Sequence, residues 1–199
     1  MSDITLISTI YTLEPVIVCI TRLSPSKIIL LTEDDVDDKK RSSEDTLELT
    51  FGKVLKIEKK VTSLYDTVRV AQDVVDLIEE EHASGNRVHI NVSGGRKPQA
   101  FGALFGAYAR SDMVDRIVYV TEEDNSIIDF PILGFNISDT KKKILENIQS
   151  GITSVNDISK SVDISKGMAY KHLRELKAMG YILGEDGYTI TDAGRIAVI

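Results

Sequence analysis

Two short segments carry residue types that hold phosphate groups. Residues 93–97 combine a serine, two glycines and two cations, and residues 8–12 place four hydroxyl side chains around one isoleucine. Glycine lets a backbone approach a ligand closely, and a following helix start offers N–H groups and a positive dipole end to an anion. The chemistry predicted for both segments is anion binding. The residues expected to contact the ligand are Ser8, Thr9, Ile10, Tyr11, Thr12, Ser93, Gly94, Gly95, Arg96 and Lys97.

Each segment lies between an expected strand and an expected helix. Residues 4–8 and 88–92 have the apolar patterns of strands, and Pro15 and Pro98 suit the first turns of the helices that follow. The glycine pair matches neither the dinucleotide-binding fingerprint nor a P-loop. An ordinary strand-to-helix turn with exposed cations therefore remains an alternative to a phosphate site.

The first 133 residues predict an α/β sheet domain. Strand patterns alternate with helix patterns, which favours an open, mainly parallel, Rossmann-like sheet. In such sheets ligands lie beyond the carboxyl ends of the strands where the strand order reverses, commonly between the first and fourth strands. The two candidate segments follow those strands, so they should be neighbours. Strands are expected at residues 4–8, 27–31, 54–61, 88–92, 116–120 and 127–133, with the third and sixth at sheet edges.

Two helices of this domain have distinctive sequences. One is expected to begin with a capping box at Ser63 and to end at Gly85, with one apolar stripe along it. The other follows Pro98 and carries Gly102 and Gly106 among alanines. Small residues reduce helix propensity, so they are expected to permit close approach to the sheet or to a second subunit.

The C-terminal sequence predicts three helices and a hairpin. Ser138 and Ser165 are candidate N-caps of the first and third helices, and the second helix is expected at residues 154–161. Apolar runs at 181–183 and 188–190 flank a glycine-bounded turn. This order is that of a winged helix-turn-helix. We expect an α/β sheet domain at residues 1–133, a linker at 134–138 and a DNA-binding domain at 139–199.

The third of these helices is the candidate DNA-recognition helix. Residues 165–178 hold four cations against one glutamate, within a chain whose net charge is −7. An ordinary solvated helix face is the alternative, but this excess of cations favours phosphate contact. At the hairpin tip, Glu185 and Asp186 would repel phosphate, so the wing is expected to contribute little. The residues expected to contact double-stranded DNA are Ser165, Lys166, Tyr170, Lys171 and Arg174.

Charge and cysteine usage narrow the class of protein. Residues 1–138 carry a net charge of −8 and residues 139–199 a net charge of +1, which argues against nonspecific nucleic-acid binding by the whole chain. The single cysteine, Cys19, provides no disulfide framework, and short apolar runs support neither a secretion signal nor a membrane span. We expect a cytoplasmic protein. No histidine has a partner at metal-ligand spacing, so no metal site, cofactor or catalytic residue is predicted.

Residues 91–97, Asn-Val-Ser-Gly-Gly-Arg-Lys, followed by a helix and combined with the C-terminal winged helix, resemble a known family. They resemble the CRISPR-associated transcriptional regulators that join a CARF sensor domain to a winged helix-turn-helix domain, such as the archaeal Csa-type regulators. The resemblance covers nearly the whole chain. It implies a homodimer whose two CARF domains share one cyclic oligoadenylate, with cyclic tetra-adenylate as the expected ring and residues 8–12 and 93–97 as the two ligand motifs.

The function expected from this resemblance is ligand-responsive transcriptional regulation of CRISPR-Cas loci, within antiviral defence. Some CARF relatives cleave the ring slowly, so a ring nuclease is the alternative from another functional class. No general base stands out here, and we expect a sensor rather than an enzyme. A regulator of an unrelated nucleotide or anion is a third hypothesis.

Overall fold

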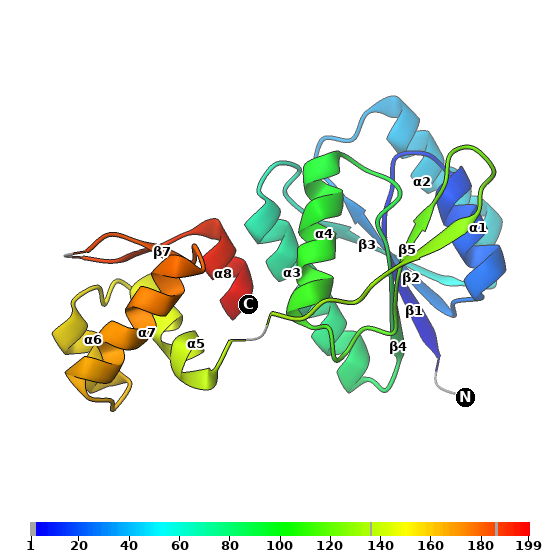
Figure 1. The fold of residues 1–199 in the computed structure, drawn as a ribbon. Coiled ribbons are helices and arrows are strands. Elements are labelled where there is room, and N and C mark those ends of the chain that lie inside the picture. Colours follow the sequence, from blue (N-terminus) through cyan, green and yellow to red (C-terminus); the bar gives the residue numbers. More distant parts are fainter. Residues whose placement is uncertain (1–2, 136, 186) are drawn as a thin grey trace. The chain divides into compact units, whose positions relative to one another are not determined.

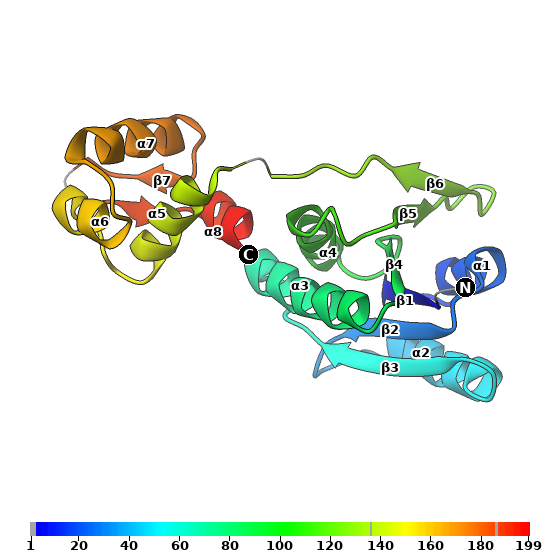
Figure 2. The ribbon, with the colours of Figure 1, turned by 90° about the horizontal axis from the view of Figure 1, so that it is seen from below.

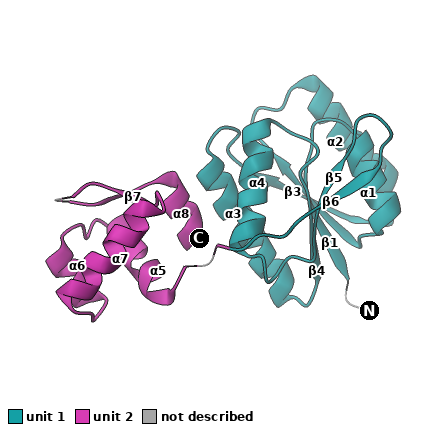
Figure 3. Cartoon of the chain, in the orientation of Figure 1, with its two compact units in different colours: residues 1–134 teal, residues 135–199 magenta. Residues whose placement is uncertain are grey.

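The computed structural model describes residues 3–135, 137–185 and 187–199. The chain divides into two compact units, residues 1–134 and 135–199 (Figure 3). The sequence predicts that the first domain ends at residue 133 and that the second begins at residue 139. No helix in the described ranges has both the length and the apolar character needed to cross a bilayer.

The first unit is built on a six-stranded sheet with the strand order β3-β2-β1-β4-β5-β6. The first five strands are parallel, and β6 pairs antiparallel with β5 at one edge. The predicted α/β architecture is confirmed, and the strand order reverses between β1 and β4 as expected. The elements are β1 (Ile4–Thr9), α1 (Glu14–Leu23), β2 (Lys27–Thr32), α2 (Asp38–Phe51), β3 (Lys56–Val61), α3 (Thr67–Ala83), β4 (Arg87–Asn91), α4 (Lys97–Ala109), β5 (Arg116–Val120) and β6 (Ile127–Phe130).

Helices cover both faces of this sheet. Helices α3 and α4 pack on one face, and α1 and α2 pack on the other (Figures 1 and 2). Neighbouring residues of a strand point to opposite faces, so Leu6 joins the core under α1 while Ile7 joins the core under α3 and α4. Both side chains are fully buried. Burial on both sides explains why the central strands are almost continuously apolar.

Glycines in α4 allow it to lie very close to α3. A Cβ atom placed at Gly102 would be 2.6 Å from the Cβ atom of Val70, and one at Gly106 would be 2.9 Å from that of Val74. The small residues therefore face a neighbouring helix, whereas the sequence suggests the sheet or a second subunit. The larger Phe101 lies on the other side of α4 and is 53% exposed.

The start of α3 differs from the prediction. Asp66 is the N-cap, and its carboxylate accepts a hydrogen bond from the backbone N–H of Arg69 at 3.0 Å. The hydroxyl of Ser63 instead accepts a bond from the N–H of Asp66. The expected capping box at Ser63 is therefore wrong by three residues. The end of the helix near Gly85, which has φ +80°, agrees with the prediction.

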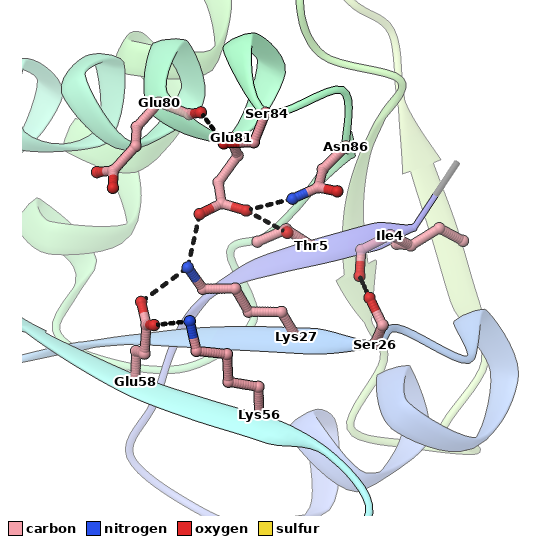
Figure 4. A network of polar contacts seen from close by, with 10 residues as sticks. All are labelled: Ile4, Thr5, Ser26, Lys27, Lys56, Glu58, Glu80, Glu81, Ser84 and Asn86. Carbon is pink, nitrogen blue, oxygen red and sulfur yellow. Dashed lines mark hydrogen bonds and ion pairs between the residues drawn. The ribbon is translucent and has the colours of Figure 1, made fainter. Parts of the chain in front are cut away.

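A polar network ties together the amino ends of the strands, opposite the candidate ligand site (Figure 4). The buried carboxylate of Glu81 accepts hydrogen bonds from Thr5 and Lys27 at 2.6 Å and from Asn86 at 2.8 Å. Lys27 also pairs with Glu58 at 2.8 Å. Burial raises the pKa of Glu81, but the three donors outweigh it and hold the pKa below its ordinary value. The network therefore keeps a buried charge satisfied between β1, β2 and α3.

The second unit has the order expected of a winged helix-turn-helix. The hydroxyl of Ser165 caps its helix as predicted, and that of Ser154 caps the helix before it. Ser138 occupies a cap position without a cap bond among the described residues. A short C-terminal helix is present that the sequence does not predict. The elements are α5 (Asp139–Gln149), α6 (Val155–Ser161), α7 (Lys166–Ala178), β7 (Ile182–Leu183), β8 (Thr189–Ile190) and α8 (Asp192–Val198).

Candidate ligand site and nucleic-acid interface

A cavity of about 410 Å³ lies beyond the carboxyl ends of β1, β4 and β5. It is bounded by the loop after β1, the loop after β4 and the turn between β5 and β6. The two predicted segments are thus neighbours, as the sheet topology requires. The lining residues are Tyr11, Thr12, Glu14, Pro15, Ser93, Gly94, Gly95, Val120, Thr121, Glu122 and Asn125.

The glycine pair permits contact between the two loops. A Cβ atom at Gly94 would be 2.8 Å from the carbonyl oxygen of Thr9 and 3.1 Å from the backbone nitrogen of Tyr11. Gly95 has φ +74°, and the space above it is filled by the amide oxygen of Gln99 at 2.6 Å from such a Cβ. The sequence predicts that these glycines give a ligand close access. In the structure, Gly94 first serves to bring the β1 loop against the β4 loop.

Asn91 joins the three strands that carry the site. Its buried amide donates a hydrogen bond to the hydroxyl of Ser8 at 2.9 Å and accepts bonds from the N–H and hydroxyl of Ser93. The hydroxyl of Ser93 also accepts a bond from the N–H of Val120 at 2.7 Å, and the hydroxyl of Thr9 donates to the carbonyl of Asn91. The floor of the cavity is therefore fixed by hydrogen bonds that connect β1, β4 and β5.

These contacts change the roles expected for the β1 segment. The side chains of Ser8, Thr9 and Ile10 are each fully buried, and Ile10 belongs to the apolar core under α1. The hydroxyls of Ser8 and Thr9 are occupied within the fold. The interpretation of Ser8, Thr9 and Ile10 as side-chain ligand contacts does not agree with this arrangement, whereas Tyr11 and Thr12 line the cavity.

The cations of the second segment lie at the rim. Ser93, Gly94 and Gly95 line the cavity, while Arg96 and Lys97 are exposed beside it at the start of α4. Arg96 is the residue before the helix, and the first turn contains Pro98. The N–H groups of a first turn have no acceptor within their own helix, so they and the two side chains offer positive charge to an anion.

The turn after β5 is a part of the site that sequence reasoning missed. Thr121, Glu122 and Asn125 line the cavity, and Asn125 adopts a left-handed backbone with φ +56°. Their position directly after a strand next to β4 was the available indication, because carboxyl ends of neighbouring parallel strands share one edge. Hydroxyl and amide side chains add hydrogen-bonding groups to the site.

Two carboxylates at the cavity are held in their charged forms. The pKa of Glu14 is lowered by hydrogen bonds from its own backbone N–H and from the hydroxyl of Thr12. The hydroxyl of Tyr119, which donates to Glu122 at 2.5 Å, lowers the pKa of Glu122. Carboxylates with lowered pKa values are weak proton acceptors near neutral pH.

The histidines lie away from the cavity lining. Burial lowers the pKa of His89 to about 4, and neither ring nitrogen has a hydrogen-bond partner among the described residues. His82 is exposed near the end of α3, and His172 lies on α7 with its Nδ1 atom 3.6 Å from Glu175.

In the second unit, α7 presents its predicted cationic face. Ala169, Leu173 and Leu176 are buried on one side, and Lys166, Lys171 and Arg174 are exposed. The other predicted contacts lie on the same helix: Tyr170 is 56% exposed, and Ser165 caps the helix through a bond from the N–H of Met168.

One cation of α7 is paired with the wing. The Nζ atom of Lys177 lies 2.9 Å from the carboxylate of Glu185. This contact neutralises positive charge beside the groove between α7 and the hairpin, which is lined by Tyr170, Arg174 and Tyr188 among others. Asp186, the other acidic residue expected at the wing tip, lies outside the described residues.

Comparison with known families places both units. Residues 4–125 match the family described as HFX_2341_N-like, N-terminal. The chain belongs to this family. Residues 137–182 match the winged helix-turn-helix DNA-binding family HTH_24. No curated protein matches the chain.

Solved structures share the fold at low sequence identity. Can2 from Sulfobacillus thermosulfidooxidans, in complex with cyclic tetra-adenylate, matches 98% of this chain and 64% of its own, with a TM-score of 0.50 and 15% identity. Csm6 from Enterococcus italicus, bound to cyclic hexa-2′-fluoro-hexa-dAMP, matches 91% and 57%, with a TM-score of 0.56 and 11% identity. Protein VC1899 from Vibrio cholerae matches 97% and 63%, with a TM-score of 0.54 and 13% identity.

The chain therefore spans less than two thirds of the length of these proteins. The likeness to Can2 and Csm6 shows a shared fold. The sheet unit is followed by a winged helix-turn-helix of a DNA-binding family.

Proposed function

We propose that this protein is a homodimeric transcriptional regulator of CRISPR-Cas loci that binds promoter DNA and responds to cyclic oligoadenylate, with cyclic tetra-adenylate as the ring. The observation that carries the proposal is one chain holding both a cavity between two phosphate-type loops and a winged helix with an exposed cationic face. The first part suits a nucleotide ligand and the second suits double-stranded DNA.

A symmetric ring suits a site shared by two copies. The cavity of about 410 Å³ lies toward the lower end of the roughly 300–1,000 Å³ typical of small-ligand sites, so one protomer would enclose only part of a four-nucleotide ring. A two-fold dimer would present two cavities, two α4 starts and two pairs of Arg96 and Lys97 to the repeating phosphates. Ligand binding would then favour one dimer geometry and so alter DNA affinity.

We further propose that the protein senses the ring without cleaving it. The hydroxyls of Ser8 and Thr9 are engaged in the fold, and the pKa values of Glu14 and Glu122 are lowered. These features disfavour a general base at the cavity. Incubation with an excess of labelled cyclic tetra-adenylate should give no linear product. Conversion of several rings by each protein molecule would instead support a ring nuclease.

The main test is promoter-DNA affinity with and without cyclic tetra-adenylate, measured by fluorescence anisotropy alongside calorimetry of ring binding. We expect ring binding and a change in DNA affinity. Substituting Arg96→Ala with Lys97→Ala should weaken ring binding and leave DNA affinity without ligand unchanged, because both side chains are exposed on the first unit. Failure of the unmodified protein to bind the ring would remove the sensor proposal.

A further inference from the structure

The ring of Tyr11 brings a cation of α2 next to the cavity lining. Tyr11 lines the cavity, and two cations lie against its ring: Lys39, with Nζ 5.2 Å from the ring centroid, and Arg96, with Cζ 5.9 Å from it. Cations at these distances are attracted by the ring quadrupole. Lys39 belongs to α2, which neither predicted segment includes.

Helix α2 is attached to the same loop through its own side chains. The hydroxyl of Ser43 lies 3.3 Å from the carbonyl oxygen of Tyr11, to which it donates. Near the start of α2, Asp37 accepts a hydrogen bond from the N–H of Lys40 at 2.9 Å. The bond to Asp37 lies within α2 and fixes its first turn, and the bond from Ser43 attaches the helix to the ligand loop.

Asp37 adds an opposing charge at this position. The N–H of Lys40 lowers the pKa of Asp37, and the hydroxyl of Tyr11 and the charge of Arg96 lower it further. Asp37 is therefore ionised near neutral pH, and it places a negative charge at the N-cap of α2, two residues before Lys39. The local field combines two cations and one fixed anion around one aromatic ring.

We propose that the ligand surface continues past Tyr11 onto the first turn of α2, where Lys39 contacts ligand phosphate and Asp37 limits the affinity by repelling it. This inference rests on the proposed function, because it extends the same cyclic-oligoadenylate site. Tyr11 lines the cavity and both cations lie against its ring, so a ligand phosphate that reaches this ring meets Lys39 as well as Arg96. Lys39 is exposed and already oriented by the aromatic ring, so little side-chain ordering is needed when it meets a phosphate.

The test is calorimetric titration of the full chain with cyclic tetra-adenylate. Lys39→Met removes the charge and keeps most of the side-chain length, and it should weaken binding about three- to tenfold, as expected when a charged interaction is removed at a partly solvated site. Lys53→Met is the matched control, because Lys53 is also exposed and follows the far end of α2. Its effect should be less than about twofold.

A second pair of variants tests whether removal of the Asp37 charge raises the affinity for the ring. Asp37→Asn removes the anion but retains an N-cap residue of equal quality, so α2 should stay intact and affinity should rise about three- to tenfold. Asp34→Asn, in the exposed loop before α2, is its control and should leave affinity within about twofold. Raising the salt concentration should reduce the change in affinity caused by Lys39→Met and by Asp37→Asn, because salt screens charge interactions.

The outcomes separate this inference from the proposed function. If the unmodified protein binds the ring and Lys39→Met behaves like Lys53→Met, the α2 surface is wrong and the cavity site stands. If Asp37→Asn weakens binding, the repulsive role of Asp37 is wrong. If the unmodified protein binds no ring, the proposed function fails and the extension fails with it.

Discussion

Replacement of Asn91 by alanine tests the link between the sheet and the ligand site most directly. Asn91 is fully buried, and its side chain donates to Ser8 and accepts two bonds from Ser93. Alanine leaves the N–H of Ser93 without this acceptor and opens a small cavity beneath the loop. A lost net hydrogen bond costs about 1 kcal/mol and an unsatisfied buried group about 1–3 kcal/mol, so we expect Asn91→Ala to lower the free energy of unfolding by about 2–4 kcal/mol.

Urea denaturation measures this change, with hydrogen exchange of the β4 peptide assigning the transition to the first unit. Asn156→Ala is the control, because its exposed side chain should change stability by less than about 0.5 kcal/mol. Ring affinity should fall as well in Asn91→Ala, since the loop after β4 loses its anchor. A stability change as small as that of the control would refute the view that this amide fixes the site.

Three further outcomes follow from the charges of the two units. Glu81→Gln should lower the free energy of unfolding by about 1–3 kcal/mol at neutral pH, because Lys27 loses a buried counter-ion. The pKa of Glu81 is below its unfolded value of 4.5, so its contribution is present above that pH and lost below it. The difference between variant and unmodified protein should therefore shrink in urea titrations below pH 4.5. Lys171→Ala with Arg174→Ala should weaken DNA binding and reduce the salt slope by about two, since each of the two cations is expected to neutralise one phosphate, and an unchanged slope would indicate another docking face. Glu185→Gln should raise DNA affinity about twofold at low salt in the same anisotropy assay, because a carboxylate that repels phosphate is removed.

The sheet could be predicted from sequence because each strand is marked by the residues of its own segment. Apolar strands buried on both faces and the rule for strand-order reversal placed the loops after β1 and β4 together. Helix α2 was not predicted, because Leu47 is the only apolar residue of its span that the structure buries in the described part of the chain. A helix with so little apolar surface lacks the periodicity on which sequence interpretation depends.

The candidate site was less predictable, because side-chain direction at a strand end is set by tertiary contacts. Residues 8–10 carry two hydroxyls that look available in sequence, yet the chain turns them into the fold beside Asn91. Helix α4 shows the same limit. Its larger apolar residues mark it as a helix, but its buried positions include Gly102 and Gly106, because close approach to α3 leaves no room for larger side chains there.

Gly94→Ala tests whether a glycine is needed at this position for the contact between the two loops or for access of the ligand. The added Cβ would meet only backbone atoms, at 2.8 Å from the oxygen of Thr9 and 3.0 Å from Cα of Ile10, and neither can move without shifting β1. We expect stability to fall by about 1–3 kcal/mol even without ligand, measured by calorimetric unfolding. Gly167→Ala, in α7, meets nothing closer than the Ser165 hydroxyl at 4.0 Å and should instead gain about 0.5–1 kcal/mol from helix propensity. If Gly94→Ala kept full stability and lost only ring affinity, the glycine would serve the ligand directly and the close contact between the loops would not require it.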